Sequence, residues 1–123
     1  MVEIKTILMV DDSPTVRLVM GSSLASKGYA VLYEPNAANG LAAAKEKKPN
    51  LIVLDLMLPD RSGLDVLKEL KESPDTKGIP VIILTGKDGG DEVVKGRQLG
   101  ADDYCVKLST TPKIMYDKVS RLI

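Results

Sequence analysis

Polar side chains come directly after four apolar runs of this sequence. The runs and the residues that follow them are Ile7–Val10 with Asp11 and Asp12, Leu51–Leu54 with Asp55, Val81–Leu84 with Thr85, and the run ending at Val106 with Lys107. Carboxylates suit hard divalent cations such as Mg²⁺, an ammonium group binds phosphate or carboxylate oxygens, and a hydroxyl donates to a phosphoryl oxygen. If the fold brings these side chains together, they suit phosphoryl transfer beside a metal ion.

Three carboxylates in one place need a compensating charge. At about 4 Å and an effective dielectric constant near 20, each pair of like charges costs about 4 kcal/mol. Magnesium typically binds one or two carboxylates, waters and a phosphate oxygen, and so offsets that repulsion. We therefore predict a Mg²⁺ site at Asp11, Asp12 and Asp55, with Asp55 as a carboxylate nucleophile.

Each of these residues also has a simpler interpretation. Asp11 and Asp12 precede a Ser-Pro pair, and acidic residues are favourable near the N-terminus of a helix. Asp55 at the end of an apolar strand needs a partner, which a structural ion pair with Lys107 would supply. Only the combination of residues from four strands predicts a site.

The elements that must position these residues follow from the pattern of the chain. Short, continuous apolar runs rich in β-branched residues are typical of a parallel sheet that is covered on both faces. Helix caps, helical spacing and terminal Gly or Pro residues predict helices between the runs. The predicted strands are Ile7–Val10, Leu51–Leu54 and Val81–Leu84, with weaker candidates at Tyr29–Tyr33 and Asp103–Val106. The predicted helices are Ser13–Gly28, Asn36–Lys48, Ser62–Glu72, Gly90–Leu99 and Thr111–Leu122.

Five alternating β–α units with right-handed crossovers predict an α/β fold with a doubly wound five-stranded parallel sheet. The expected strand order is the flavodoxin-like 2-1-3-4-5, with helices on both faces, and ligands bind outside the carboxyl ends of such strands. A length of 123 residues favours one domain, residues 1–123.

Composition excludes several classes of function. Seventeen basic and seventeen acidic residues give no net charge, which argues against direct nucleic-acid binding or binding to an anionic membrane. The chain has no histidine, so His-ligated zinc and Ser-His-Asp catalysis are excluded, and it has no Gly-rich nucleotide-binding string. A single cysteine, Cys105, and the lack of an apolar run of about 18 residues lead us to expect a cytoplasmic protein.

The joint motif resembles the response-regulator receiver family of two-component signalling, over nearly the whole chain. The segments that carry the resemblance are Asp11-Asp12, Asp55-Leu56-Met57-Leu58-Pro59 with Gly63, Thr85-Gly86, and Gly100 to Lys107. The resemblance implies a phosphoacceptor that is not an enzyme for other substrates and that catalyses only its own phosphorylation and slow dephosphorylation. The implied partners are a sensor histidine kinase or phosphotransfer protein and a downstream output domain or target protein.

The resemblance also implies a role for each site residue. Asp55 would be phosphorylated, and Mg²⁺, for which Mn²⁺ can substitute, would bind Asp55, Asp12 directly, Asp11 mostly through water, and the backbone carbonyl of Met57. Lys107 would contact the phosphoryl group. Thr85 would hydrogen-bond that group and couple it to Tyr104, an aromatic that moves between exposed and inward positions in the family.

One departure from the family concerns the residue after Lys107. The family has a proline there, after a cis peptide bond, whereas this chain has Leu108. A cis bond before a non-proline residue costs roughly 2.5–4 kcal/mol, so we predict a trans Lys107–Leu108 bond and a rearranged loop through Thr111. Because this loop positions Lys107, the change is expected to affect the efficiency of phosphorylation.

Two other functions compete with the phosphoacceptor switch. A pseudo-receiver would act as a protein-interaction module independently of phosphorylation, and the missing proline favours it. A hydrolase of the aspartyl-phosphate type generally needs an acid two residues after the nucleophile, where this chain has Met57.

Overall fold

The computed structural model describes residues 3–86 and 90–123. Five strands form one parallel sheet in the order β2-β1-β3-β4-β5. Their bounds are β1 (Thr6–Val10), β2 (Ala30–Glu34), β3 (Leu51–Asp55), β4 (Val81–Thr85) and β5 (Asp103–Val106). The predicted strand order and all five strands are confirmed.

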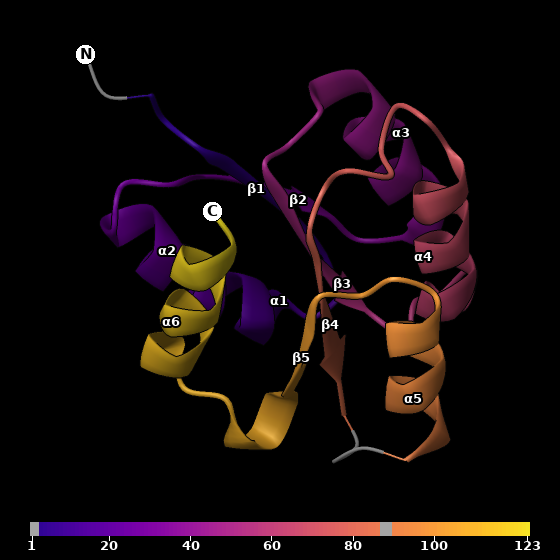
Figure 1. The fold of residues 1–123 in the computed structure, drawn as a ribbon. Helices are drawn as coiled ribbons and strands as arrows, with labels where there is room; N and C mark the ends of the chain where they lie inside the picture. The colour runs from indigo at the N-terminus through magenta and orange to yellow at the C-terminus, as the bar shows by residue number, and fades with distance from the viewer. Residues whose placement is uncertain (1–2, 87–89) are drawn as a thin grey trace.

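Helices cover both faces of the sheet (Figure 1). They are α1 (Pro14–Val16), α2 (Ser22–Ser26), α3 (Ala37–Lys47), α4 (Gly63–Glu72), α5 (Asp91–Gln98) and α6 (Pro112–Leu122). One apolar layer packs α3 and α4 against the sheet, and the other packs α2 and α6 against its opposite face. Because β3 and β4 lie at the centre and are covered on both faces, every residue in them is buried, which explains their continuous apolar sequences.

The predicted helix starts are confirmed at both Ser-Pro and Thr-Pro pairs. The Ser13 hydroxyl accepts the Val16 N–H at 3.3 Å, and the Thr111 hydroxyl accepts the Ile114 N–H at 3.1 Å. Proline occupies the first helical position in both cases, where its missing N–H has no intrahelical partner to lose. Both helices therefore begin immediately after the loops that carry the polar residues.

The first predicted helix differs from the continuous α-helix that we expected. A π-helical turn at Arg17–Gly21 separates α1 from α2. A Cβ atom at Gly21 would lie 2.1 Å from the Tyr33 hydroxyl oxygen, so the ring of this β2 residue lies directly against the helix backbone. The Arg17 guanidinium also lies 4.9 Å from the centroid of the Tyr33 ring. The widened turn thus coincides with a contact between elements that periodicity alone does not reveal.

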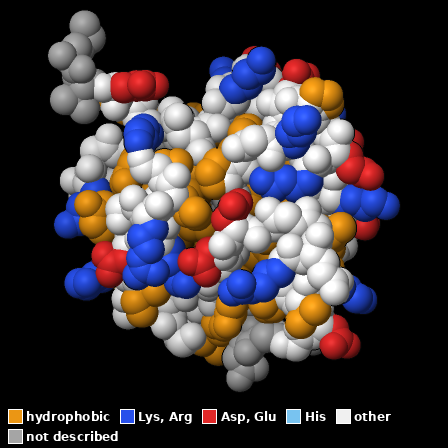
Figure 2. Space-filling model, in the orientation of Figure 1, with side chains coloured by type: hydrophobic (Ala, Val, Ile, Leu, Met, Phe, Trp, Pro, Cys, Tyr) orange, Lys and Arg blue, Asp and Glu red, His pale blue; other side chains and the backbone are white. Residues whose placement is uncertain are grey.

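Two further features concern the charge of the visible face and the length of the helices. Figure 2 shows basic and acidic side chains interspersed over the visible face. Within residues 3–86 and 90–123, no helix is both long and apolar enough to cross a bilayer.

Candidate active site

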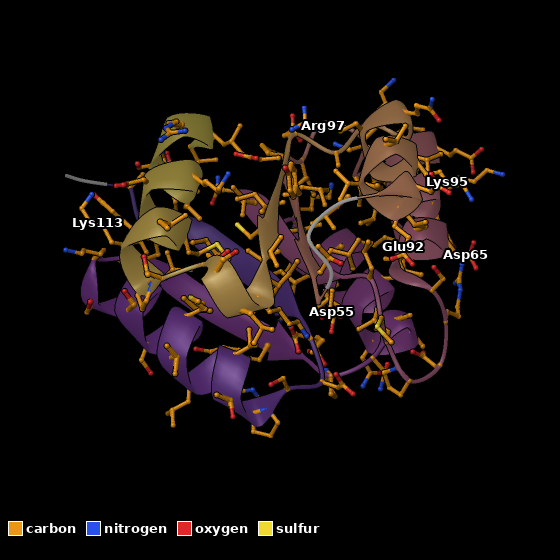
Figure 3. All side chains as sticks on the ribbon, turned by 90° about the horizontal axis from the view of Figure 1, so that it is seen from below. Asp55, Asp65, Glu92, Lys95, Arg97 and Lys113 are labelled. Carbon is orange, nitrogen blue, oxygen red and sulfur yellow. The ribbon has the colours of Figure 1, made fainter. Side chains whose placement is uncertain are left out.

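The carboxyl ends of β1, β3 and β5 bring three of the predicted residues together. Asp11 follows β1, Asp55 ends β3, and Lys107 follows β5. Figure 3 looks onto this edge of the sheet, with Asp55 near the middle and the labelled residues of α4, α5 and α6 farther out. Asp11, Asp12 and Asp55 each offer a carboxylate oxygen, and these oxygens all lie within 4.8 Å of one another. The fold therefore brings Asp55 to two acids that lie more than forty residues earlier in the sequence.

Asp55 is a buried carboxylate with a partner on each oxygen. Its side chain accepts the Met57 N–H at 3.0 Å through Oδ1 and the Lys107 ammonium at 2.9 Å through Oδ2. The residue is only 1% exposed. A buried carboxylate of this kind needs such partners to remain ionised. The two contacts hold it at the edge of the sheet in one orientation.

Asp11 has one satisfied oxygen and one unsatisfied oxygen. Its Oδ1 accepts the Ser13 N–H at 2.7 Å. Its Oδ2 lies 3.3 Å from the Lys107 ammonium in an ion pair, and this buried oxygen has no direct hydrogen-bond partner among the described residues. A buried acceptor that lacks a hydrogen bond costs roughly 1–3 kcal/mol. The Lys107 charge compensates this oxygen in part, and its remaining coordination capacity suits a bound cation.

The electrostatics of the cluster show an excess of negative charge. Burial raises the pKa of Asp11, and the negative charge of Asp55 adds to this effect, while the Ser13 N–H and Lys107 oppose it. Burial acts to lower the pKa of Lys107, but its hydrogen bond to Asp55 and the charges of Asp55 and Asp11 outweigh burial and raise that pKa. Lys107 therefore stays protonated, yet this one ammonium group contacts two carboxylates, with the Asp12 carboxylate close by.

The three acids fit a divalent cation. Asp11 and Asp55 are buried, whereas Asp12 is exposed, so the cluster is closed toward the core and open toward solvent. An open oxygen-lined site suits magnesium, which usually retains several waters and uses few protein ligands. The unsatisfied Asp11 oxygen is the observation that supports this fit most directly.

Thr85 lies on β4, the strand next to Asp55, and Tyr104 lies one strand farther away, on the edge strand β5. Thr85 ends β4 and is 3% exposed. It is in register with Val106, and Ile83 is in register with Tyr104, so Tyr104 lies two residues farther from the carboxyl edge of the sheet. Its half-buried ring has the Arg97 guanidinium 5.3 Å and the Lys118 ammonium 5.9 Å from its centroid. The structure thus places Tyr104 between α5 and α6 and outside the carboxylate cluster.

The peptide bond after Lys107 has the predicted trans configuration, whereas the predicted rearrangement of the loop through Thr111 stays a prediction. The Lys107–Leu108 bond is trans, as are all peptide bonds in the described parts of the chain. Lys107–Ser109 form a 3₁₀ turn, and the Leu108 side chain is 95% exposed. Lys107 nevertheless reaches Asp55 at 2.9 Å, so this turn positions the ammonium group without a proline.

Two contacts behind the site could not be found in the sequence pattern. The Asp60 carboxylate accepts two N–H groups at the start of α3, and Gly63 lies so close to the β3 backbone that a Cβ there would be 2.2 Å from the Asp55 carbonyl oxygen. Gly63 belongs to the motif that resembles the receiver family, but the local sequence does not reveal which backbone it approaches. For Asp60 the only signal is the Pro-Asp pair of a turn, which does not name a partner.

Comparison with known proteins agrees with this geometry. The family model of the response regulator receiver domain matches residues 7–117. The chain is 38% identical over 101 residues to protein PilH of Pseudomonas aeruginosa, which covers 82% of this chain and 84% of PilH. It is 41% identical over 103 residues to the phosphate regulon transcriptional regulatory protein PhoB of the same organism, covering 84% of this chain but 45% of PhoB. The chain therefore spans less than half the length of PhoB.

A solved structure shows the same fold. The receiver domain of sensor histidine kinase PA1611 from Pseudomonas aeruginosa, which has a magnesium ion coordinated in its active-site cleft, superposes with a TM-score of 0.88. The match covers 98% of each chain at 23% identity. Together with the family match over residues 7–117, these findings show that the chain belongs to the response regulator receiver domain family of two-component systems.

Proposed function

We propose that this chain is a phosphoacceptor switch that takes a phosphoryl group on Asp55 in a Mg²⁺-dependent reaction. The single observation that carries the proposal is the contact of the buried Asp55 carboxylate with Lys107 at 2.9 Å, inside a cluster that also contains Asp11 and Asp12. The donor is a sensor histidine kinase or a phosphotransfer protein. The phosphoryl–nitrogen bond of the donor breaks as a bond from an Asp55 oxygen to phosphorus forms.

Asp11, Asp12, Asp55 and the Met57 backbone carbonyl would hold the magnesium ion, and Mn²⁺ would substitute for it. When bound, the ion supplies positive charge that offsets the carboxylate repulsion and the charge of the transferred group. The family neighbour with magnesium in its active-site cleft supports this assignment. So does the buried Asp11 oxygen that lacks a hydrogen bond.

The residues of the chain itself position and stabilise the reacting groups. The Met57 N–H fixes one Asp55 oxygen, which limits rotation of the nucleophile. Lys107 is protonated and lies at the Asp55 oxygen, so it is placed to contact the phosphoryl oxygens once they arrive. The chain thereby catalyses its own phosphorylation and slow dephosphorylation, and it has no other substrate.

Thr85 and Tyr104 would convert phosphorylation into a signal. Thr85 would hydrogen-bond the phosphoryl group, and Tyr104 would respond by changing its exposure on the face formed by β5 and α6. The Tyr104 ring lies near the Arg97 guanidinium and the Lys118 ammonium, and a rotation of the ring would change these cation–π contacts. Tyr104→Ala should alter the effect of phosphorylation on partner binding. Unchanged partner affinity in both phosphorylation states would contradict this coupling.

The proposed cellular context follows from the family. We assign residues 1–123 to one receiver domain that controls an output domain or a target protein and does not itself bind nucleic acid or membrane. The mixed charges of the visible face support this assignment (Figure 2). The buried free thiol of Cys105 is compatible with the reducing cytoplasm, where we place the protein.

Phosphorylation by a small donor tests the proposal directly. The chain is incubated with Mg²⁺ and acetyl phosphate, and its intact mass is measured with and without excess chelator. We expect the addition of one phosphoryl group that requires Mg²⁺, and no addition to Asp55→Asn. Asp65→Asn on the exposed start of α4 is the matched control and should react like the parent. A parent chain that gains no mass would overturn the proposal and favour a phosphorylation-independent interaction module.

A further inference from the structure

Asp60 connects the loop after Asp55 to the start of α3. Its Oδ1 accepts the Ala37 N–H at 2.8 Å, and its Oδ2 accepts the Ala38 N–H at 3.0 Å. The first N–H groups of a helix have no intrahelical partner, and the positive end of the helix dipole favours a carboxylate. Accordingly, these two N–H groups lower the pKa of Asp60. The contact joins residues more than twenty positions apart, although the Asp60 side chain is exposed.

The loop that Asp60 anchors is also anchored at the nucleophile. The Met57 N–H donates to Asp55, and Met57 forms an isolated antiparallel bridge with Ser62. The Gly63 N–H donates to the Leu56 carbonyl at 2.8 Å. The short segment from Met57 to Asp60 is therefore fixed at one end by Asp55 and at the other by α3.

Helix α3 in turn lies against the strand that carries the other two acids. A Cβ at Gly40 would lie 2.7 Å from Cγ1 of Val10, so the helix backbone contacts the last residue of β1 closely. Asp11 and Asp12 follow Val10 directly. The Asp60 contact thus links the Met57 backbone to a helix that packs against Val10, the residue that precedes Asp11 and Asp12.

We propose that Asp60 is a positioning residue for the metal centre, holding the Met57 backbone at a fixed place relative to Asp11 and Asp12. The inference rests on the proposed function, in which the Met57 carbonyl is a metal ligand. Without Asp60, the segment can move away from α3 while the three acids stay where they are. Residues that orient metal ligands typically change metal affinity by 10- to 100-fold when removed. Because Asp60 orients one ligand of several, we expect a loss near the lower end of that range.

The test measures Mg²⁺ affinity by isothermal titration calorimetry, with no phosphodonor present. Asp60→Ala should weaken Mg²⁺ binding about tenfold. Asp60→Asn, which retains one carbonyl oxygen as acceptor, should give an intermediate value and serves if Asp60→Ala does not fold. Circular dichroism confirms that each variant is folded. Amide NMR shifts of Met57 on titration with Mg²⁺ give a second readout, which should be smaller in Asp60→Ala than in the parent.

Two control variants separate positioning from general effects. Asn36→Ala removes a different cap from the same helix end, the acceptor of the Asn39 N–H at 2.8 Å, without touching the Met57 segment. Asp65→Asn removes one exposed negative charge from α4, at a distance from Asp55 (Figure 3). Both controls should bind Mg²⁺ like the parent.

Each outcome has one meaning. Parental affinity in Asp60→Ala, or an equal loss in Asn36→Ala, would overturn the positioning role and leave the proposed function intact. An equal loss in Asp65→Asn would show that charge alone is responsible and would also overturn the role. A parent chain that binds no Mg²⁺ would overturn both the inference and the metal-dependent function.

Discussion

The two ends of strand β5 carry lysine–aspartate pairs with similar distances and different burial of the aspartate. At its start, the Lys118 ammonium lies 3.0 Å from Asp103, and both side chains are 23% exposed. After its end, the Lys107 ammonium lies 2.9 Å from Asp55, and the lysine side chain is 25% exposed. The distances and lysine exposures are nearly equal. The aspartates differ, because the Asp55 side chain is only 2% exposed.

The surroundings explain the difference. Asp103 and Lys118 form a balanced pair at the surface, which contributes modestly to stability. Lys107 instead serves Asp55 and Asp11, with Asp12 close by, so one positive charge faces three negative charges. Pair geometry therefore does not identify a functional site here. The local sum of charge and the burial of the acids distinguish the two pairs.

The largest expected effect comes from removing each lysine. Lys107→Met should slow phosphorylation of Asp55 by acetyl phosphate about 10²-fold, because a cationic hydrogen-bond donor positioned at the transferred phosphoryl group is lost. Lys118→Met should leave the rate unchanged. The rate of phosphoryl incorporation is followed by intact mass at saturating Mg²⁺. Equal rates for both variants would remove the distinction between the two ends of β5.

The second-largest expected effect is the stabilisation of the fold by Mg²⁺, which should depend on the acids near Lys107 and not on Asp103. An ion that binds the folded chain and not the unfolded chain raises the free energy of unfolding, by about 2.7 kcal/mol when the free ion is at 100 times its Kd. Thermal melts with and without Mg²⁺ should therefore show a higher Tm for the parent and for Asp103→Asn alike. Asp12→Ala should lose most of this shift. A parent melt that is insensitive to millimolar Mg²⁺ would mean that the acidic cluster holds no ion.

Removal of one acid from each end should change stability in opposite directions in the metal-free chain. Asp11→Asn relieves a buried charge whose pKa is raised by burial, so the free energy of unfolding should rise by about 1 kcal/mol. Asp103→Asn loses a partly exposed ion pair and should lower it by less than about 1 kcal/mol. Urea denaturation in the presence of a chelator measures both. A destabilising Asp11→Asn would show that the Lys107 contact already balances that acid.

The smallest expected effect is the pH dependence of the increase in the free energy of unfolding that Asp11→Asn produces. The folded-state pKa of Asp11 lies above its ordinary value of 3.8, so the ionised side chain opposes folding at neutral pH. That opposition disappears as the pH falls through the raised pKa and is gone below the unfolded value. The stability difference between Asp11→Asn and the parent should thus be largest near pH 7 and close to zero below pH 3.8. A difference that does not change with pH would contradict the raised pKa.

The sequence predicted the sheet well because continuous apolar runs have few other interpretations. Leu51–Leu54 and Val81–Leu84 became the buried central strands, and the weaker Tyr29–Tyr33 and Asp103–Val106 became the two edges. The convergence of Asp11, Asp12, Asp55 and Lys107 also followed, because parallel strands end at one edge of a sheet. The end of each strand is visible in the local sequence, and the parallel topology then places these ends at the same edge of the sheet.

Contacts between distant elements could not be predicted in the same way. The π-helical turn at Arg17–Gly21 coincides with the Tyr33 ring from β2, and the Asp60 carboxylate reaches the start of α3. Neither contact leaves a periodic signal, because each depends on how a loop or strand lies against a helix after folding. The same holds for Tyr104, whose two cationic neighbours come from α5 and α6.

The glycine at position 63 has a consequence for how the domain accommodates a new group. Helix α4 begins against the backbone of Asp55 and Leu56, with no room for even one methyl group between them. The main chain beneath Asp55 therefore has no room to retreat toward α4 under the proposed phosphorylation, in which the carboxylate gains a bulky, doubly charged substituent. Adjustment must come from the solvent side, where Asp12 is exposed and Lys107 is partly so. A structure of the phosphorylated protein should differ in these rim side chains more than in the backbone of residues 55 and 56.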